Sequence, residues 1–224
     1  MVKVIIGIPV KGDSESFKEM IYSLVSSTSG YDKIIIAVAE GINQEGLDAI
    51  EWAKGYNSAI EISKERFKNS LEAYNYLFNQ AKQEQSDLFL TQTDVLFPRL
   101  YKRDWLKQMN QMAQNEQVGA ITGINGGGTS GPDYIDGFYW LGGWCSYYPL
   151  RTIELIGGYD KEFPFGWGVD IDHTYRISKT GLKIVQVNYW VDHHMLNDRS
   201  HELNPDSEKQ KKDASKYFKQ KYGL

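Results

Sequence analysis

Over the first 90 residues, apolar strand-like segments alternate with segments of helical periodicity, and this alternation constrains the fold most. The strand-like segments are Val2–Val10, Tyr31–Ala39, Ser58–Ile62 and Asp87–Leu90, and the first two are rich in Val and Ile. Between them, apolar residues recur every three or four positions, which is typical of amphipathic helices. Because a helix between two strands favours a right-handed crossover, we expect an α/β fold with a mostly parallel central sheet flanked by helices.

The predicted helices are marked by three sets of residues. These are Phe17, Met20, Ile21, Leu24 and Val25 after a capping Ser16, then Leu47–Lys54, then Phe67, Leu71, Tyr74, Phe78 and Ala81. The second half of the chain predicts a loop at Gly126–Gly128, a helix near Ile171–Ser178 closed by Gly181, a strand at Lys183–Val191 and a terminal helix at Asp206–Tyr222. Neither an internal repeat nor a linker is visible, so we expect one domain spanning residues 1–224.

Composition excludes several classes of protein. A chain of 224 residues with 41% hydrophobic residues has enough apolar material for a core without metal or disulfide support, and Cys145 is its only cysteine. The formal net charge of −4 argues against a nucleic-acid partner. The apolar stretches are shorter than the ~20 residues of a membrane span, and the N-terminus does not resemble a leader peptide, so we expect a cytoplasmic protein.

Ligands of parallel α/β sheets bind outside the carboxyl ends of the strands, which here are Pro9–Asp13, Ala39–Asn43 and Thr91–Val95. The last of these contains Asp94, whose hard carboxylate oxygens suit Mg²⁺ or Mn²⁺ bound to a diphosphate. The alternative is that Asp94 only begins a turn before Pro98.

A second candidate is the segment Phe165–Asp172, in which Gly166 and Gly168 permit a close backbone approach to a ligand. Asp170 or Asp172 can serve there as a general base. The alternative is that either carboxylate caps the helix that follows.

The third candidate is Asp192-His193-His194, which closes a predicted strand. A neutral imidazole is a common metal ligand, and strand alternation points His193 and His194 to opposite faces, so one of them is expected to reach a given site. A surface histidine pair is the alternative. No P-loop GxxxxGK, HExxH or GxSxG motif is present, nor a GxGxxG after the first strand.

Taken in order, these segments resemble the GT-A-fold glycosyltransferases of the family-two type. The matching segments are Val4–Val10, Ile34–Glu40, Ala73-Tyr74-Asn75, Leu90–Val95, Trp105-Leu106, Ile156–Phe163, Gly166–Asp172, Tyr175-Arg176, Lys179–Ile184 and Tyr217–Gly223. The resemblance covers nearly the whole chain and implies a GT-A, Rossmann-like single domain. It further implies a nucleotide-sugar-binding half at residues 1–98, an acceptor-binding half at 99–205 and a C-terminal helix at 206–224.

The resemblance implies a metal-dependent, inverting transfer of a sugar from a UDP- or GDP-linked donor to a hydroxyl of a sugar, lipid-linked or protein acceptor. Asp170 would be the catalytic base, and Asp94 with His193 or His194 would hold Mn²⁺ or Mg²⁺. The donor would contact Pro9, Val10, Lys11, Glu40, Arg66, Gln92, Thr93 and Asp94. The alternative for Arg66 is that it is an exposed residue at the start of a helix and does not contact the donor.

Eleven aromatic residues lie between Tyr134 and Trp167, and the acceptor is expected on this side because flat aromatic faces cover the apolar faces of sugars. The acceptor-binding candidates are Trp140, Trp144, Trp167 and Asp172, with ordinary core packing as the alternative for the tryptophans. The C-terminal helix is basic, which would allow peripheral contact with an anionic membrane. The alternative is that its lysines form an ordinary solvated face.

Three positions depart from the family pattern. Gln92 replaces the first acid of the DXD motif, Val169 replaces the first acid of the ED pair, and Tyr74 stands where Arg is usual. Two other functions stay open, and the loss of the two acids motivates the first of them. One is a carbohydrate- or nucleotide-binding protein with a decayed active site, and the other is a sugar-1-phosphate nucleotidyltransferase, although the latter lacks its basic, Gly-rich phosphate loop after the first strand.

Overall fold

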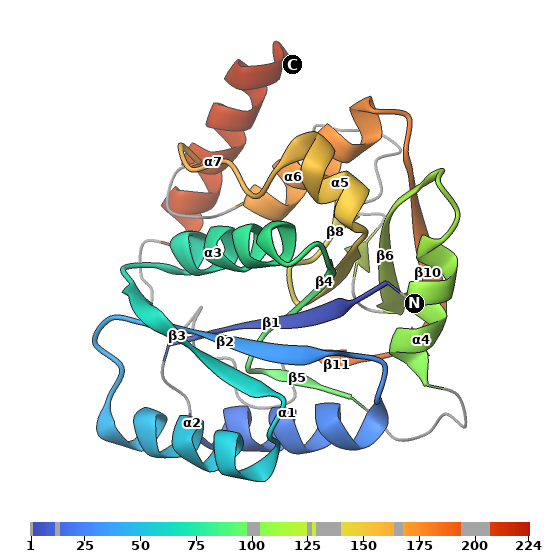
Figure 1. The fold of residues 1–224 in the computed structure, drawn as a ribbon. Coiled ribbons are helices and arrows are strands. Elements are labelled where there is room, and N and C mark those ends of the chain that lie inside the picture. Colours follow the sequence, from blue (N-terminus) through green and yellow to red (C-terminus); the bar gives the residue numbers. More distant parts are fainter. Residues whose placement is uncertain are drawn as a thin grey trace.

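The computed structural model describes residues 2–11, 14–97, 104–124, 127–128, 140–163, 168–193 and 207–224. Its centre is a seven-stranded sheet in the order β10-β6-β9-β4-β1-β2-β3, with helices on both faces (Figure 1). The expected α/β fold with a mostly parallel sheet is confirmed.

The first half of the chain forms the parallel part of the sheet. Its strands are β1 (Val4–Val10), β2 (Lys33–Ala39), β3 (Ile60–Phe67) and β4 (Asp87–Thr91), and the helices between them are α1 (Ser14–Ser27), α2 (Gln44–Tyr56) and α3 (Ser70–Gln83). β1 pairs in parallel with both β2 and β4, and β2 with β3. The carboxyl ends of these four strands therefore lie at one edge of the sheet.

One predicted boundary in this half is wrong. β3 continues to Phe67, and α3 begins only after Asn69, whose side chain accepts a hydrogen bond from the backbone N–H of Glu72. Arg66 accordingly lies in the edge strand β3, paired with Val38, and not at the start of a helix.

The second half adds an antiparallel strand to the sheet. β9 (Cys145–Tyr148) lies between β4 and β6 (Val118–Ile124), and β10 (Lys183–Trp190) extends the sheet in parallel with β6. The remaining elements are β5 (Val95–Leu96), α4 (Trp105–Ala113), β7 (Gly127–Gly128), β8 (Trp140–Leu141), α5 (Leu150–Ile156), α6 (Val169–Lys179), β11 (Asp192–His193) and α7 (Ser207–Tyr222). β9 falls inside the aromatic segment, and its Tyr147 and Tyr148 are fully buried, so part of that segment is core.

Two hydrophobic layers sandwich the sheet. One face packs against α1, α2 and α4, and the other packs against α3, α5, α6 and α7 (Figure 1). In the second layer, α5 contacts both α3 and α6, and residues of α7 join the same buried cluster. Among the helices in the described part of the chain, none combines the length and the apolarity that a bilayer span requires.

Candidate functional site

The turn between β4 and β5 holds Gln92, Thr93 and Asp94, all of them partly buried. Gln92 Nε2 donates a hydrogen bond to the hydroxyl of Tyr74 at 2.6 Å. Tyr74 belongs to α3 and is almost fully buried. The turn at the carboxyl end of β4 is therefore fastened to the helix that packs over the sheet.

Asp170 lies in the first turn of α6, at the same edge of the sheet. The helix begins at Val169, and Gly168 precedes it with a φ of 72°, a left-handed conformation that favours glycine. Gly168 holds the N-cap position and has no side chain to cap with, so neither Asp170 nor Asp172 is the N-cap residue that the sequence left open.

The Asp170 carboxylate is held by backbone N–H groups. It accepts a hydrogen bond from Ile171 at 2.9 Å and further ones from the N–H groups of Asp170 itself and of Gly143. Burial nevertheless raises its pKa to about 6, because desolvation outweighs these donors. A carboxyl group with a pKa near neutrality suits proton transfer.

Gly143 brings Asp170 and Tyr74 together. A Cβ atom at Gly143 would lie 3.2 Å from the hydroxyl of Tyr159 and 3.6 Å from the hydroxyl of Tyr74. Burial raises the pKa of Tyr74, and the negative charges of Asp170 and Asp94 raise it further. Tyr74 therefore lies within electrostatic range of both carboxylates, and the β4–β5 turn and the first turn of α6 form one site around it.

Of the predicted metal ligands, the structure describes Asp94 and the backbone of His193. β5 pairs antiparallel with β11, and His193 lies opposite Val95, the residue that follows Asp94. The backbone of the His193 strand end is thus adjacent to the Asp94 turn, while the His193 side chain and His194 lie outside the described residues. Among the described side chains, no group of three His, Cys, Asp or Glu residues is placed to hold a metal ion.

The remaining donor-side candidates follow the ends of β1 to β3. Pro9 is partly buried, Val10 is packed in the core, and Lys11 is exposed just beyond it. Glu40 is exposed after β2, where its backbone N–H donates to Phe67. Arg66 is exposed on β3. The side chain of Val10 therefore has no free surface for a ligand, whereas Lys11, Glu40 and Arg66 do.

Asp172 does not have the acceptor-binding environment expected of it. Its carboxylate is fully buried and accepts hydrogen bonds from Arg176, Lys221 and Tyr222 at 2.6–2.9 Å. A carboxylate that is enclosed and saturated in this way links α6 to α7 and has no surface left for an acceptor, so the expected acceptor-binding role of Asp172 is wrong.

Among the acceptor-side tryptophans, Trp144 is partly buried, and its ring lies over the backbone of Gly142. It directly follows Gly143, which donates to Asp170. The side chain of Trp140 and all of Trp167 lie outside the described residues. Sequence reasoning missed Gly143 and Tyr159 as site residues, although the Gly142-Gly143 pair beside a tryptophan is a signal of close backbone approach.

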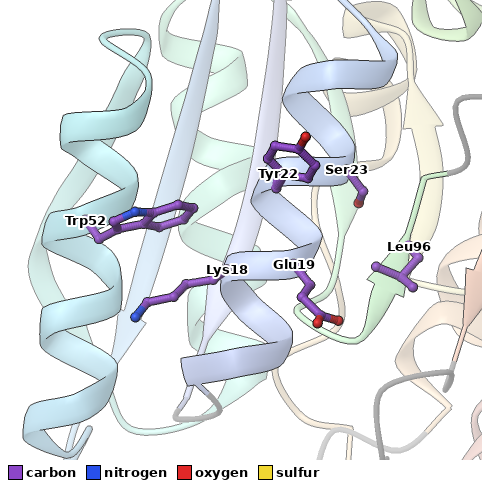
Figure 2. Close-up of a pocket in the computed structure, with 6 residues that line it drawn as sticks. All are labelled: Lys18, Glu19, Tyr22, Ser23, Trp52 and Leu96. Atoms are coloured by element: carbon purple, nitrogen blue, oxygen red, sulfur yellow. The ribbon is translucent and has the colours of Figure 1, made fainter.

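A separate hollow of about 480 Å³ runs along α1 (Figure 2). It is lined by Lys18, Glu19, Tyr22, Ser23, Trp52 and Leu96. Leu96 lies two residues after Asp94, but none of the predicted site residues lines the hollow. It is thus distinct from the site around Tyr74.

The sheet order, the crossovers and the position of the Asp94 turn define a GT-A type of fold. Solved structures with this architecture include the mannosyltransferase PcManGT from Pyrobaculum calidifontis in complex with GDP-Man and Mn²⁺, at a TM-score of 0.63 and 14% identity over 84% of this chain and 55% of that one. GalNAc-T7 with UDP, GalNAc and Mn²⁺ matches at a TM-score of 0.66 and 14% identity, over 86% of this chain and 44% of that one.

A third similar structure is the 4-diphosphocytidyl-2C-methyl-D-erythritol synthase, at a TM-score of 0.56 and 8% identity over 93% of this chain and 97% of that one. No protein-family model matches the chain, and no curated protein matches it either. The chain spans about half the length of the mannosyltransferase. At such identities the likeness establishes the fold, and the ligands named above belong to those proteins.

Proposed function

We propose that this chain is a metal-dependent glycosyltransferase that moves a sugar from a nucleotide-diphosphate donor to an acceptor hydroxyl. The observation that supports this most is the convergence of Asp170 and the Gln92–Asp94 turn around Tyr74 and Gly143. A carboxyl group of raised pKa lies there near a turn that carries a second acid, Asp94, at the edge where α/β sheets bind their ligands.

The donor would lie across the ends of β1 to β4. Its base would contact Pro9 and Lys11, and its ribose would contact Glu40 and Gln92. Lys11 and Arg66 are exposed cations at this edge, and positive charge there favours a diphosphate. Thr93 adds a hydroxyl at the turn. The GDP-Man bound to the mannosyltransferase and the UDP bound to GalNAc-T7 make these two bases the first to test.

The residues present fit a divalent cation in their chemistry. Asp94 offers hard carboxylate oxygens on a partly buried turn, and the pairing of β5 with β11 brings His193 opposite Val95, the residue after Asp94; His194 follows His193 in the chain. Asp94 and one of these histidines would hold Mn²⁺ or Mg²⁺, with phosphate oxygens completing the shell. When bound, such an ion neutralises negative charge on a leaving diphosphate.

Asp170 would remove the proton from the acceptor hydroxyl. Its backbone donors fix the orientation of the carboxylate, and its raised pKa makes it a stronger base than an exposed aspartate. A direct attack on the anomeric carbon from the face opposite the diphosphate would invert the configuration. Trp144, with Trp140 and Trp167, would cover the apolar face of an acceptor sugar.

Two other functions remain to be separated by experiment. A binding protein with a decayed active site would bind donors and never transfer. A sugar-1-phosphate nucleotidyltransferase is favoured by one observation, the fold match to the synthase over nearly its full length. It would consume a nucleoside triphosphate and a sugar phosphate instead of a nucleotide sugar.

The deciding experiment incubates the purified protein with UDP- and GDP-sugars and Mn²⁺, and in parallel with nucleoside triphosphates and sugar phosphates. We expect donor binding that depends on Mn²⁺, with release of UDP or GDP when an acceptor is supplied. Asp94→Ala should abolish the Mn²⁺ dependence of donor binding. Asp170→Asn should reduce turnover on the order of 10²- to 10⁴-fold and leave donor affinity unchanged.

Glu19→Gln, on the exposed face of α1, serves as the matched control and should behave like the parent protein. Donor binding without release under every condition would support the binding protein, and pyrophosphate release would support the nucleotidyltransferase. An Asp170→Asn protein with undiminished turnover would overturn the assignment of the base.

A further inference from the structure

The last turn of α7 contacts the segment that carries the candidate base. Lys221 Nζ donates to Asp172 at 2.6 Å, and the Tyr222 hydroxyl donates to the same carboxylate oxygen at 2.7 Å. Asp172 is two residues after Asp170, in the same helical turn. The end of the described chain is therefore connected to the candidate active site through one buried carboxylate.

Lys221 also reaches the loop that carries Tyr159. Its Nζ donates to Asp160 Oδ2 at 3.0 Å, and the Tyr217 hydroxyl donates to the same oxygen at 3.0 Å. Tyr159, the neighbour of Asp160, points its hydroxyl at Gly143, which in turn donates to Asp170. One ammonium group thus bridges the two segments that approach Gly143 from α6 and from the loop after α5.

Aromatic packing fixes α7 in the position from which Lys221 makes these contacts. Tyr217 packs edge-on against Phe163 with ring centroids 5.0 Å apart, and Tyr222 packs against Tyr175 at 4.5 Å. Phe218 is fully buried in the layer that covers this face of the sheet. The position of the ammonium is therefore set by the helix and not by the long Lys side chain alone.

Among the described residues, Arg176 is the only other cation that contacts Asp172, and its guanidinium also binds two backbone carbonyls. Its Nε donates to Asp172 at 2.9 Å, while its two terminal nitrogens donate to the backbone carbonyls of Ile156 and Gly158 at 2.6 Å each. Because a buried carboxylate tolerates the loss of a partner poorly, removal of Lys221 would force the first turn of α6 to shift toward water.

We propose that Lys221 and Tyr222 are positioning residues, and that the last turn of α7 acts as a latch that holds Asp170 and Tyr159 in place against Gly143. The role of the latch in catalysis rests on the proposed function of Asp170, whereas its effect on the geometry of α6 does not. Lys221 touches no substrate and acts only through Asp172 and Asp160.

The test uses Lys221→Met, Lys221→Arg and Tyr222→Phe, with Lys216→Met on the exposed face of α7 as the matched control. The first readout is amide exchange by NMR at Asp172, whose N–H donates to Gly168 in the first turn of α6. We expect exchange about tenfold faster in Lys221→Met than in the parent, with Ala73 in the first turn of α3 unchanged.

The second readout is kinetic. Lys221→Met should lower kcat on the order of 10- to 100-fold, because a small displacement of a base weakens proton transfer, while Mn²⁺-dependent donor binding at Asp94 stays unchanged. Lys221→Arg should restore most of the rate, since a guanidinium can bridge both carboxylates. Tyr222→Phe should show a smaller change in the same direction, and it removes only one hydroxyl if Lys221→Met does not fold.

Unchanged exchange at Asp172 in both Lys221→Met and Tyr222→Phe would overturn the latch. If no transfer is found for the parent protein with any donor, the proposed function fails, and the exchange measurement still tests the latch. If exchange accelerates while kcat is unaltered, the contact is structural and the positioning role is refuted.

Discussion

Asp170→Asn should make the protein more stable at neutral and alkaline pH, because the native state holds this carboxyl group at a cost. Burial raises its pKa from 3.8 to about 6, so ionisation is less favourable in the folded than in the unfolded chain. The folded state therefore binds the proton more tightly. The loss of unfolding free energy that ionisation of Asp170 causes is fully present above pH 6, and it disappears as the pH falls from 6 toward 3.8.

The magnitude follows from that shift. At pH 8 the difference between the two pKa values corresponds to roughly 3 kcal/mol, and at pH 4 about 0.5 kcal/mol of it remains, because the native carboxyl is then protonated. Asparagine removes the ionisation, although its amide nitrogen cannot accept from the backbone donors of Ile171 and Gly143. That loss is independent of pH, so the change between pH 4 and pH 8 isolates the ionisation.

The assay is urea unfolding of the parent and Asp170→Asn at intervals from pH 4 to pH 8, with Glu19→Gln as an exposed carboxylate control. Relative to the parent, Asp170→Asn should gain roughly 2.5 kcal/mol of unfolding free energy between the two ends of the series. Glu19→Gln should show no comparable trend. A difference between parent and Asp170→Asn that does not vary with pH would refute the raised pKa, and with it the argument for a poised base.

Three further substitutions test separate parts of the site. Gly158→Ala would place a methyl group 2.2 Å from Asn75 Oδ1 and should lower the unfolding free energy by about 1–3 kcal/mol in urea. Tyr74→Phe leaves Gln92 Nε2 without its acceptor and should cost about 1–2 kcal/mol while weakening donor binding, measured by calorimetry. Trp144→Ala should raise the acceptor KM about tenfold and leave the donor KM unchanged in a coupled assay for diphosphate release.

Most of the parallel half of the fold could be predicted from the sequence because its signals are local. The buried strands β1, β2 and β4 are continuous apolar runs, and α1 and α3 show a regular apolar period. β3 was placed too short because it is an edge strand, and its exposed residues between Ser63 and Phe67 break the apolar run.

The features that sequence reasoning missed depend on contacts between distant residues. The acceptor-binding role predicted for Asp172 is wrong because two of its partners, Lys221 and Tyr222, are about 50 residues further along the chain, and no local pattern shows that they enclose it. β9 was hidden in the aromatic segment because its pairing with β4 and β6 is non-local. The candidate base and the Asp94 turn could be predicted, whereas the Tyr74 hydroxyl that joins them could not.

Tyr74 and Gln92 both depart from the pattern of the glycosyltransferases that the chain resembles, in which Arg and Asp are usual. Taken one at a time, each departure suggests a decayed site. In the structure the two side chains are hydrogen-bonded to each other at 2.6 Å, so a neutral pair stands where opposite charges are usual. A lone carboxylate at position 92 would be partly buried and near Asp94 and Asp170 without a cation, which is unfavourable.

A double-mutant cycle tests this coupling. Gln92→Asp alone should destabilise the protein because it adds a negative charge near Asp94 and Asp170, and Tyr74→Arg alone should do so because it replaces a buried ring and removes the acceptor of Gln92. The double variant should be at least about 1 kcal/mol more stable than the sum of the single changes predicts, measured by urea unfolding at pH 7. Additive effects would mean that the two positions are independent, and the amide at position 92 would then count as evidence for a lost function.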